Sequence, residues 1–249
     1  MNQRAFFIQK TMNDYQKFLE TKKKTFLESG FEINESELNN NLFDFQKYTV
    51  KTALAKGRFA LFFDCGLGKT LMQLSWADAV YNYTNKKVLI LAPLAVVEQT
   101  KDECLKFGIN KDSFDITNYD QLKNIENINK YSGVVLDESS ILKGRDGKLS
   151  SLIITLFKNT PYKLACTATP SPNDHMELGQ HSEFLGAMSY LEMLAMYFVH
   201  DGGETSKWRL RKHEKTLFGN MYVLGLWLVI SLLHWGLTHA DMIYLKLNL

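Results

Sequence analysis

The sequence has few cysteines, and none are spaced for a metal site or a disulfide framework. Among 249 residues there are three, Cys65, Cys104 and Cys166, scattered along the chain. An odd, scattered set excludes a disulfide-stapled fold and a zinc spacing, and is typical of a reduced cytoplasmic protein. His175 and His181 have no neighbouring cysteines or carboxylates in a pattern that would complete a metal site. We therefore expect a cytoplasmic protein without structural zinc.

The sequence also lacks a strong charge imbalance. Lys and Arg number 29 against 27 Asp and Glu, a formal net charge of +2. Total charge therefore does not indicate a nucleic-acid partner, and any such partner would need a local basic patch. Hydrophobic residues make up 45% and charged residues 22%, which excludes a disordered chain. No internal repeat or low-complexity tract is present, and the length suits one large domain with a small annex.

Long apolar runs are absent from most of the chain. The N-terminus has no sustained apolar stretch, so we expect no signal peptide. Residues 217–238 contain no Asp, Glu, Lys or Arg, and "MYVLGLWLVISLLHWGL" is long enough to test as a membrane span. Two glycines, a serine and a histidine interrupt it. We expect a buried or interface helix here rather than a membrane span. The other alternative is an exposed apolar patch that binds a partner.

Between these ends, short apolar runs alternate with helix-like stretches. Each run except the last is followed by a helix-like stretch before the next one begins. The runs are RFALFF (58–63), KVLILAP (87–93), SFDITN (113–118), YSGVVLDE (131–138) and YKLACTATP (162–170). This alternation predicts buried parallel strands with crossover helices, an open α/β sheet whose ligands bind at the carboxyl ends of the strands. We divide the chain into a helical extension (1–42), this core (43–172) and a helical, basic accessory segment with an apolar tail (173–249).

A glycine-rich segment, "DCGLGKT", follows the first run. Gly66 and Gly68 would let successive backbone N–H groups point into one concavity, and Thr70 would open a helix with a partly positive N-terminus. A triphosphate suits that concavity, with Lys69 on the β- and γ-phosphates and the Thr70 hydroxyl on Mg²⁺. The full eight-residue phosphate-loop pattern begins with Gly, whereas Phe63 stands there. The alternative is a glycine-rich turn followed by a chance Lys-Thr pair.

An acidic pair ends the fourth run, in "GVVLDESS". Two carboxylates at the end of a buried strand are costly unless they bind a cation or transfer protons. Asp137 would hold Mg²⁺, directly or through water, and Glu138 would orient and deprotonate the attacking water. The alternative is an acidic N-cap of a following helix. The glycine-rich loop earlier in the chain favours the first interpretation.

Five segments, taken together and in order, resemble the motifs of superfamily 2 helicases. They are "DCGLGKT", "APLAVVEQT", "ITNYDQL", "VVLDESSILKG" and "CTATPSPND". The resemblance covers residues 42–174 and is closest to the phage-encoded, Swi/Snf-like branch with a DESS variant of the DEAD box. It implies a RecA-like P-loop domain that binds ATP and Mg²⁺, in the host cytoplasm if the protein is viral. Upstream, "FDFQKYTV" resembles the adenine-recognition element, which would place Gln46 at the adenine edge, unless that residue is simply an exposed glutamine on a core helix.

The resemblance also implies roles in nucleic-acid binding and in coupling. Thr167 and Thr169 in "TATP" would couple the nucleotide state to the nucleic-acid groove. Hydroxyls, amides and backbone N–H groups at strand ends can bind phosphates without reading sequence, or can simply cap loops. The residues that would lie along the nucleic-acid backbone are Pro93, Leu94, Gln99, Thr117, Asn118 and Tyr119.

A later segment, "HDGGETSKWRLRKHEK", is a candidate single-strand contact. It gathers basic residues around an aromatic side chain, a combination that binds single strands through charge and stacking. A solvated basic loop is the alternative. The residues concerned are Lys207, Trp208, Arg209 and Arg211. The partner we expect is a nucleic acid, with DNA preferred to RNA.

A second motor lobe is not evident in the sequence. Helicases of this kind use an arginine finger from a second lobe, and such an arginine is worth about 10³–10⁵ in rate in phosphoryl-transfer enzymes. After the fifth run there is no further set of alternating strands and no paired-arginine motif. We expect one ATP-binding lobe that hydrolyses ATP slowly alone and needs a second lobe, in another chain or in a longer product. The alternatives are a different phosphate-loop enzyme, such as a kinase, and a non-catalytic nucleic-acid-binding or regulatory module.

Overall fold

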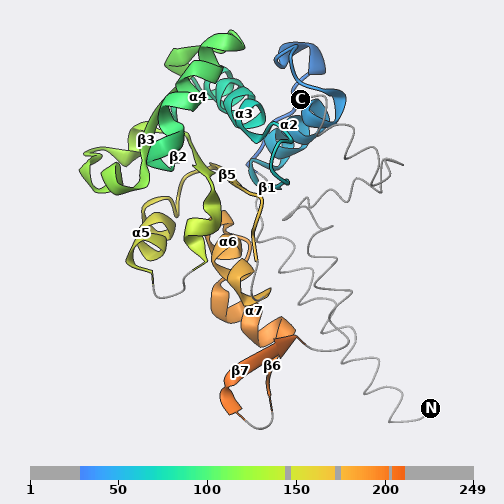
Figure 1. Ribbon diagram of the computed structural model, residues 1–249, viewed down its shortest axis with the longest axis vertical. Helices are drawn as coiled ribbons and strands as arrows, with labels where there is room; N and C mark the ends of the chain where they lie inside the picture. Colours follow the sequence, from blue (N-terminus) through green and yellow to red (C-terminus); the bar gives the residue numbers. More distant parts are fainter. Residues whose placement is uncertain (1–28, 144–146, 172–174, 202–203, 211–249) are drawn as a thin grey trace, which may run out of the picture.

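A five-stranded sheet forms the centre of the computed structural model, which describes residues 29–143, 147–171, 175–201 and 204–210 (Figure 1). The strand order is β1-β5-β4-β2-β3, and every neighbouring pair is parallel. The strands are β1 (Arg58–Phe62), β2 (Val88–Ala92), β3 (Phe114–Asn118), β4 (Gly133–Asp137) and β5 (Tyr162–Thr167). They coincide with the five apolar runs, so the predicted α/β fold with a parallel sheet is confirmed.

The pairing register brings the carboxyl ends of three strands together. Phe62 at the end of β1 pairs with Thr167 at the end of β5, and Asp137 at the end of β4 pairs with Cys166. Strand β5 therefore lies between the strand that enters the glycine-rich loop and the strand that ends in the acidic pair. The three predicted clusters share one edge of the sheet.

Helices cover both faces of the sheet (Figure 1). One face packs against α2 (Asp44–Lys56), α3 (Lys69–Thr84) and α4 (Leu94–Lys106), and the other against α5 (Lys148–Leu156), α6 (Leu178–Leu185) and α7 (Tyr190–Tyr197). Strand side chains alternate between the two cores. Phe59 and Leu61 join the first and Ala60 and Phe62 the second, because successive strand residues point to opposite faces.

The connection after β3 is a 3₁₀-helix, η3 (Tyr119–Asn124), where we expected a helical stretch. The Asn118 side chain begins it by accepting a hydrogen bond from the backbone N–H of Gln121. The remaining 3₁₀ segments are short. They are η1 (Glu35–Glu37), η2 (Lys111–Ser113), η4 (Ile128–Lys130), η5 (Ser139–Leu142) and η6 (His175–Glu177).

An antiparallel hairpin follows α7, and the sequence did not lead us to expect it. Strands β6 (Phe198–Asp201) and β7 (Glu204–Leu210) pair antiparallel, and Figure 1 shows them continuing from α7 away from the sheet. No helix within the described ranges is long and apolar enough to span a membrane. The predicted helical extension covers residues 1–42, of which 1–28 lie outside the described residues, as does the apolar segment 217–238. Residues 29–42 contain one short 3₁₀-helix, η1, where we expected a longer helix.

Candidate nucleotide-binding site

The glycine-rich loop has the backbone geometry that its two glycines suggest. Gly66 and Gly68 have φ angles of 81° and 71°, a left-handed region that glycine adopts without steric cost. Helix α3 begins at Lys69, and among the described residues no side chain caps its start. Its first N–H groups therefore face the loop, where they can bind an anion. The start of α3 lies where the sequence predicted the phosphate site.

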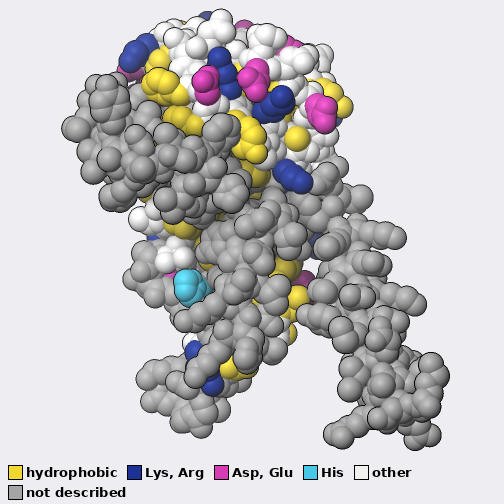
Figure 2. All heavy atoms as spheres, turned by 90° about the vertical axis from the view of Figure 1, so that its right-hand side faces the viewer, with side chains coloured by type: hydrophobic (Ala, Val, Ile, Leu, Met, Phe, Trp, Pro, Cys, Tyr) yellow, Lys and Arg dark blue, Asp and Glu magenta, His cyan; other side chains and the backbone are white. Residues whose placement is uncertain are grey.

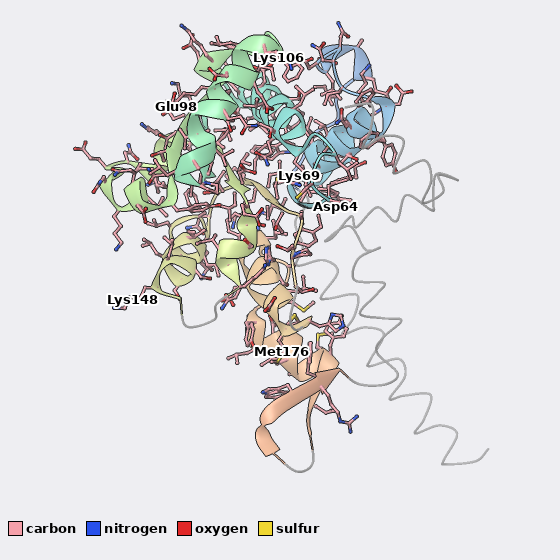
Figure 3. The ribbon with its side chains drawn as sticks, viewed as in Figure 1. Asp64, Lys69, Glu98, Lys106, Lys148 and Met176 are labelled. Carbon is pink, nitrogen blue, oxygen red and sulfur yellow. The ribbon has the colours of Figure 1, made fainter. Side chains whose placement is uncertain are left out.

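The ammonium group of Lys69 lies over the loop. Its Nζ donates hydrogen bonds to the backbone oxygens of Phe63 and Asp64, at 3.0 Å and 3.1 Å. Figure 3 shows Lys69 and Asp64 next to one another beside the end of β1. Because these partners are neutral carbonyl groups, a phosphate that replaced them would give Lys69 an oppositely charged acceptor and a stronger bond.

Gln46 is buried under the loop, with 2% of its surface exposed. Its Nε2 donates to the backbone oxygen of Leu67 at 3.0 Å, and its Oε1 accepts from the backbone N–H of Phe43 at 2.9 Å. A Cβ atom on Gly68 would overlap Gln46 Nε2. The Gln46 amide therefore supports the glycine-rich loop from below. The adenine-edge role expected of it stays a prediction.

Asp137 ends β4 and is joined by a hydrogen bond to α3, the helix that follows the glycine-rich loop. Gln73, one turn after the start of α3, donates a hydrogen bond from Nε2 to Asp137 Oδ1 at 2.8 Å. Burial raises the pKa of the Asp137 carboxyl, and the neighbouring Glu138 carboxylate adds to that rise, whereas Gln73 and the positive charge of Lys69 oppose it. The charges of Lys69 and Asp137 therefore act on one another across the site.

Glu138 adopts an uncommon backbone conformation and is held by the fifth strand. Its φ of 54° lies in the left-handed region, which is strained for a residue with a side chain. The Thr167 hydroxyl donates to Glu138 Oε1 at 2.6 Å and accepts from the backbone N–H of Thr169 at 3.0 Å. Lys143 Nζ in turn donates to Thr169 Oγ1 at 3.1 Å. The turn at Asp137 and Glu138, called the acidic turn below, and the "TATP" segment thus form one hydrogen-bonded unit.

Tyr119 supports the acidic strand instead of facing solvent. It is buried, with 7% of its surface exposed, and its hydroxyl donates to the backbone oxygen of Asp137 at 2.7 Å. Burial raises the pKa of Tyr119 well above its usual value, and the nearby Asp137 charge adds to that rise. The Tyr119 hydroxyl is therefore a neutral donor to the end of β4, and its expected place along the nucleic-acid backbone stays a prediction.

The other residues expected along the nucleic-acid backbone lie at the ends of β2 and β3. Pro93 precedes the first turn of α4, Leu94 is 70% exposed and Gln99 is exposed on the same helix. Thr117 and Asn118 end β3, next to β2 in the sheet. The residues after β2 and those at the end of β3 therefore lie at neighbouring strand ends, on the same sheet edge as Asp137.

The hairpin carries the candidate single-strand contacts. Trp208 in β7 pairs with His200 of β6 and packs partly buried against the second core, and Arg209 is exposed. Lys207 is also part of β7, but its side chain lies outside the description, and Arg211 lies outside the described residues. On the face in Figure 2 the described Lys, Arg, Asp and Glu side chains are interspersed, with no broad patch of one sign.

Sequence analysis missed three residues that the fold brings to the site. They are Gln73, Lys143 and His181, whose Nε2 lies 3.1 Å from Ser139 Oγ. Gln73 carried a weak signal, because it follows Thr70 at a helical spacing of three. Lys143 and His181 carried none, since only the tertiary fold brings them to these loops.

The donor set at this edge fits Mg²⁺ bound together with a phosphate. Within the described residues no group of three or more His, Cys, Asp and Glu side chains is placed to hold a metal. Mg²⁺ commonly uses one or two protein oxygens, with water and phosphate oxygens completing the octahedron. Thr70 and Asp137 would supply those oxygens. Gln73 Oε1 is buried here and finds no partner in the described part of the chain, and a water molecule or ligand could satisfy it.

Residues 39–157 match the protein-family model described as "Type III restriction enzyme, res subunit". No curated protein is significantly similar to the chain. Among solved structures, the SWI2/SNF2 ATPase core of Sulfolobus solfataricus matches in complex with double-stranded DNA, with a TM-score of 0.54 and 22% identity over 67% of this chain and 41% of that one. The SWI2/SNF2 ATPase core domain of the same organism matches with a TM-score of 0.52 and 23% identity over 66% of this chain and 39% of that one.

The Hef helicase domain of Pyrococcus furiosus matches with a TM-score of 0.52 and 18% identity, over 60% of this chain and 38% of that one. The chain thus spans about two fifths of the length of these three structures. At such identities the likeness establishes the fold. The described core therefore has a RecA-like fold, with a central parallel sheet flanked by helices.

Proposed function

We propose that this chain is the ATP-binding lobe of a superfamily 2 helicase or nucleic-acid translocase, of the phage-type, Swi/Snf-like branch with a DESS motif. One observation carries the proposal. The helix that begins at the phosphate loop and the strand that ends in the acidic pair are joined directly by the Gln73–Asp137 hydrogen bond, with Lys69 close enough to act on the Asp137 charge. A triphosphate and its metal would therefore meet both elements in one place.

Each residue then has a defined task. The loop N–H groups around Gly66 and Gly68 bind phosphate oxygens, and Lys69 leaves its carbonyl partners for the β- and γ-phosphates. Thr70 and Asp137 hold the metal, which when bound offsets charge on the transferring phosphoryl group. Glu138 orients a water molecule and accepts its proton. The Gln46 amide supports the loop, and in this proposal it also contacts the edge of the adenine base.

Coupling to nucleic acid would pass through the unit formed by Glu138, Thr167 and Thr169. The Thr167 hydroxyl touches the carboxylate that would activate water, while Thr169 is exposed and bonded to Lys143. A change at the γ-phosphate that moves Glu138 would therefore change the hydrogen bonds of an exposed segment. We propose DNA as the partner. Its binding surface (the nucleic-acid track) would be formed by Pro93, Leu94, Gln99, Thr117 and Asn118, and Trp208 and Arg209 of the hairpin would extend it.

A second lobe completes the motor in this proposal. The chain corresponds to about two fifths of the SWI2/SNF2 and Hef structures, and the described part contains one parallel sheet. The lobe alone would bind ATP–Mg²⁺ and hydrolyse it slowly. Fast turnover would need an arginine supplied by a second lobe, from another chain or from further sequence.

The test is a titration of the purified chain with fluorescent ATP in the presence of Mg²⁺. Lys69→Ala is compared with Lys148→Ala, a matched exposed lysine at the start of α5 (Figure 3). Losing a charge-assisted bond costs about 1.5–3 kcal/mol, so we expect Lys69→Ala to weaken binding by roughly 10- to 100-fold. Lys148→Ala should bind like wild type. Equal affinity in wild type and Lys69→Ala would instead favour a non-catalytic, nucleic-acid-binding module.

Slow turnover is tested separately by measuring ATP hydrolysis with and without single-stranded and double-stranded DNA. We expect hydrolysis that is slow, abolished by Lys69→Ala and little stimulated by DNA. Fast, DNA-stimulated turnover by this chain alone would contradict the need for a second lobe while leaving the nucleotide site in place.

A further inference from the structure

A histidine and a serine from distant parts of the chain meet beneath the acidic turn. His181 lies on α6, Ser139 directly follows Glu138, and both side chains are fully buried, with 0% exposed surface. His181 Nε2 and Ser139 Oγ are 3.1 Å apart, within hydrogen-bond distance. Separating a buried polar pair of this kind costs free energy, because neither group can form a hydrogen bond with water instead. The pair therefore restricts where Ser139 can lie.

The same histidine also contacts the strand that leads into the phosphate loop. Its ring packs edge-on against the ring of Phe62, with centroids 5.4 Å apart and planes at 89°. Phe62 is the last residue of β1 and immediately precedes Phe63, whose carbonyl binds Lys69. One side chain of α6 thus touches the segments before the phosphate loop and after the acidic pair.

The ring is neutral in this environment. Burial lowers the pKa of His181 to about 4, although nearby backbone oxygens of Glu177 and Ser139 oppose the shift. A neutral ring carries one N–H donor and one acceptor nitrogen, and a hydroxyl can bond to either. In both tautomers Ser139 Oγ is held against α6.

Glu138 needs such support. Its left-handed backbone conformation is strained and persists only when the surroundings hold it. On one side the Thr167 hydroxyl binds its carboxylate at 2.6 Å. On the other side its backbone continues into Ser139, which His181 anchors. The carboxylate direction is therefore determined by two contacts, one direct and one through the next residue.

We propose that His181 is a positioning residue for ATP hydrolysis, which acts through Ser139 to fix the turn that aims Glu138 at the attacking water. The proposal rests on the nucleotide-hydrolysing role proposed above. It assigns a function to α6, which follows the last strand of the sheet and leads through α7 into the β6–β7 hairpin. A shift of α6 when the hairpin or a second lobe engages a partner would then reach the water-activating carboxylate without passing through the phosphate loop.

The experiment measures the single-turnover rate of ATP hydrolysis and the affinity for ATP–Mg²⁺ on the same preparations. The variants are Ser139→Ala, His181→Leu, their double variant and His181→Gln, whose amide can reach the position of Nε2. Ser182→Ala is the matched control, a fully buried serine on α6 that bonds to the backbone oxygen of Met188 instead of the site. Thermal unfolding is followed for each variant.

Removing one hydrogen bond that orients the base is worth about 1–1.5 kcal/mol, so we expect Ser139→Ala and His181→Leu each to slow hydrolysis roughly tenfold. The affinity for ATP should change less than twofold. The double variant should be no slower than either single variant, because both remove the same contact. His181→Gln should recover most of the rate, and Ser182→Ala should hydrolyse like wild type.

The proposal is overturned if Ser139→Ala hydrolyses ATP like wild type, or if Ser182→Ala slows it equally. It is overturned as well if rate and affinity fall together, which indicates a general loss of structure. If His181→Leu does not fold, Ser139→Ala and His181→Gln decide the matter. A wild-type chain that does not bind ATP–Mg²⁺ would refute the proposed function itself, an outcome seen in the affinity measurement and distinct from a change in rate.

Discussion

The side-chain amide of Gln73 donates a hydrogen bond to the carboxylate of Asp137 at 2.8 Å and so joins α3 to the end of β4. The two residues come from elements that sequence analysis treated as separate motifs. In the sheet, β5 lies between β1, which leads into α3, and β4. The Gln73–Asp137 contact makes the helix after the glycine-rich loop and the strand that ends in the acidic pair one structural unit.

Gln73→Met should therefore destabilise the fold. The amide is buried, with 1% of its surface exposed, and its loss leaves a half-buried carboxylate without its donor. Hydrogen bonds to charged groups contribute about 1.5–3 kcal/mol, so we expect the free energy of unfolding in urea at pH 7 to fall by roughly that amount. Gln99→Met on the exposed face of α4 is the control and should change it by less than about 0.5 kcal/mol. Equal effects of the two changes would show that the Gln73 contact is not stabilising.

Gly68→Ala should cost more than Gly108→Ala, although the two glycines have similar backbone angles. Their φ values are 71° and 64°, so both substitutions carry the left-handed penalty of about 1–2 kcal/mol. A Cβ at Gly108 meets nothing within 4 Å, whereas one at Gly68 overlaps Gln46 Nε2. Thermal unfolding should rank Gly68→Ala as the less stable, and only that variant should lose affinity for ATP. Equal stability in both would mean that Gln46 does not support the loop.

Because of Lys163, the free energy of unfolding should increase between pH 7 and pH 9. It is 1% exposed at the start of β5, where Nζ donates to the backbone oxygens of Phe184 and Lys158, at 2.7 Å and 3.3 Å. Burial, with a smaller effect of the Arg58 charge, lowers its pKa to about 7, against about 10.4 in the unfolded chain. Above pH 7 the unfolded state holds a proton that the folded state has released, so the free energy of unfolding increases with pH.

Two pH units in that window correspond to roughly 2–3 kcal/mol from this one group. The measurement is urea unfolding of wild type and Lys163→Met at pH 7, 8 and 9. The difference between the two proteins should shift by that amount in favour of wild type as the pH rises. A constant difference would show that Lys163 stays charged in the fold, held by its two carbonyl partners.

Arg209→Ala should weaken binding to a single-stranded oligonucleotide and reduce its salt dependence. The side chain is exposed on β7 beside Trp208. If it contacts one phosphate, the slope of log affinity against log salt should fall by about 0.7. Fluorescence anisotropy with labelled DNA at several salt concentrations measures this, with Lys148→Ala as a matched exposed cation. An unchanged slope would remove the hairpin from the nucleic-acid track.

Much of the fold could be predicted from the sequence because its signals are local. The five apolar runs, the turn at Gly66 and Gly68 and a helix that begins at Lys69, one residue before the predicted Thr70, all follow from hydrophobic pattern and backbone chemistry. The strand order was not predicted, because the placement of β5 between β1 and β4 depends on packing between distant segments. The β6–β7 hairpin was missed as well, since a glycine pair and basic residues indicate a loop as readily as a turn.

The site was predicted in part for the same reason. Lys69, Asp137 and Glu138 follow strands and carry motif signals that a single sequence can show. Tyr119 illustrates the limit. Its sequence context suggested a place along the nucleic-acid backbone and gave no sign that its hydroxyl donates to the Asp137 backbone or that its ring is buried. Such long-range hydrogen bonds leave no trace in local spacing.

The most direct test of the shared pocket is the Mg²⁺ dependence of ATP binding in wild type and in Asp137→Asn. If the phosphate loop and Asp137 hold one metal–triphosphate complex, replacing Mg²⁺ by EDTA should weaken ATP binding to wild type roughly tenfold or more, the effect of losing about 1.4 kcal/mol of metal-bridged interaction. Asp137→Asn should bind ATP with nearly the same affinity in Mg²⁺ and in EDTA. An equal loss on Mg²⁺ removal in both proteins would show that Asp137 does not face the bound nucleotide, and would contradict the account.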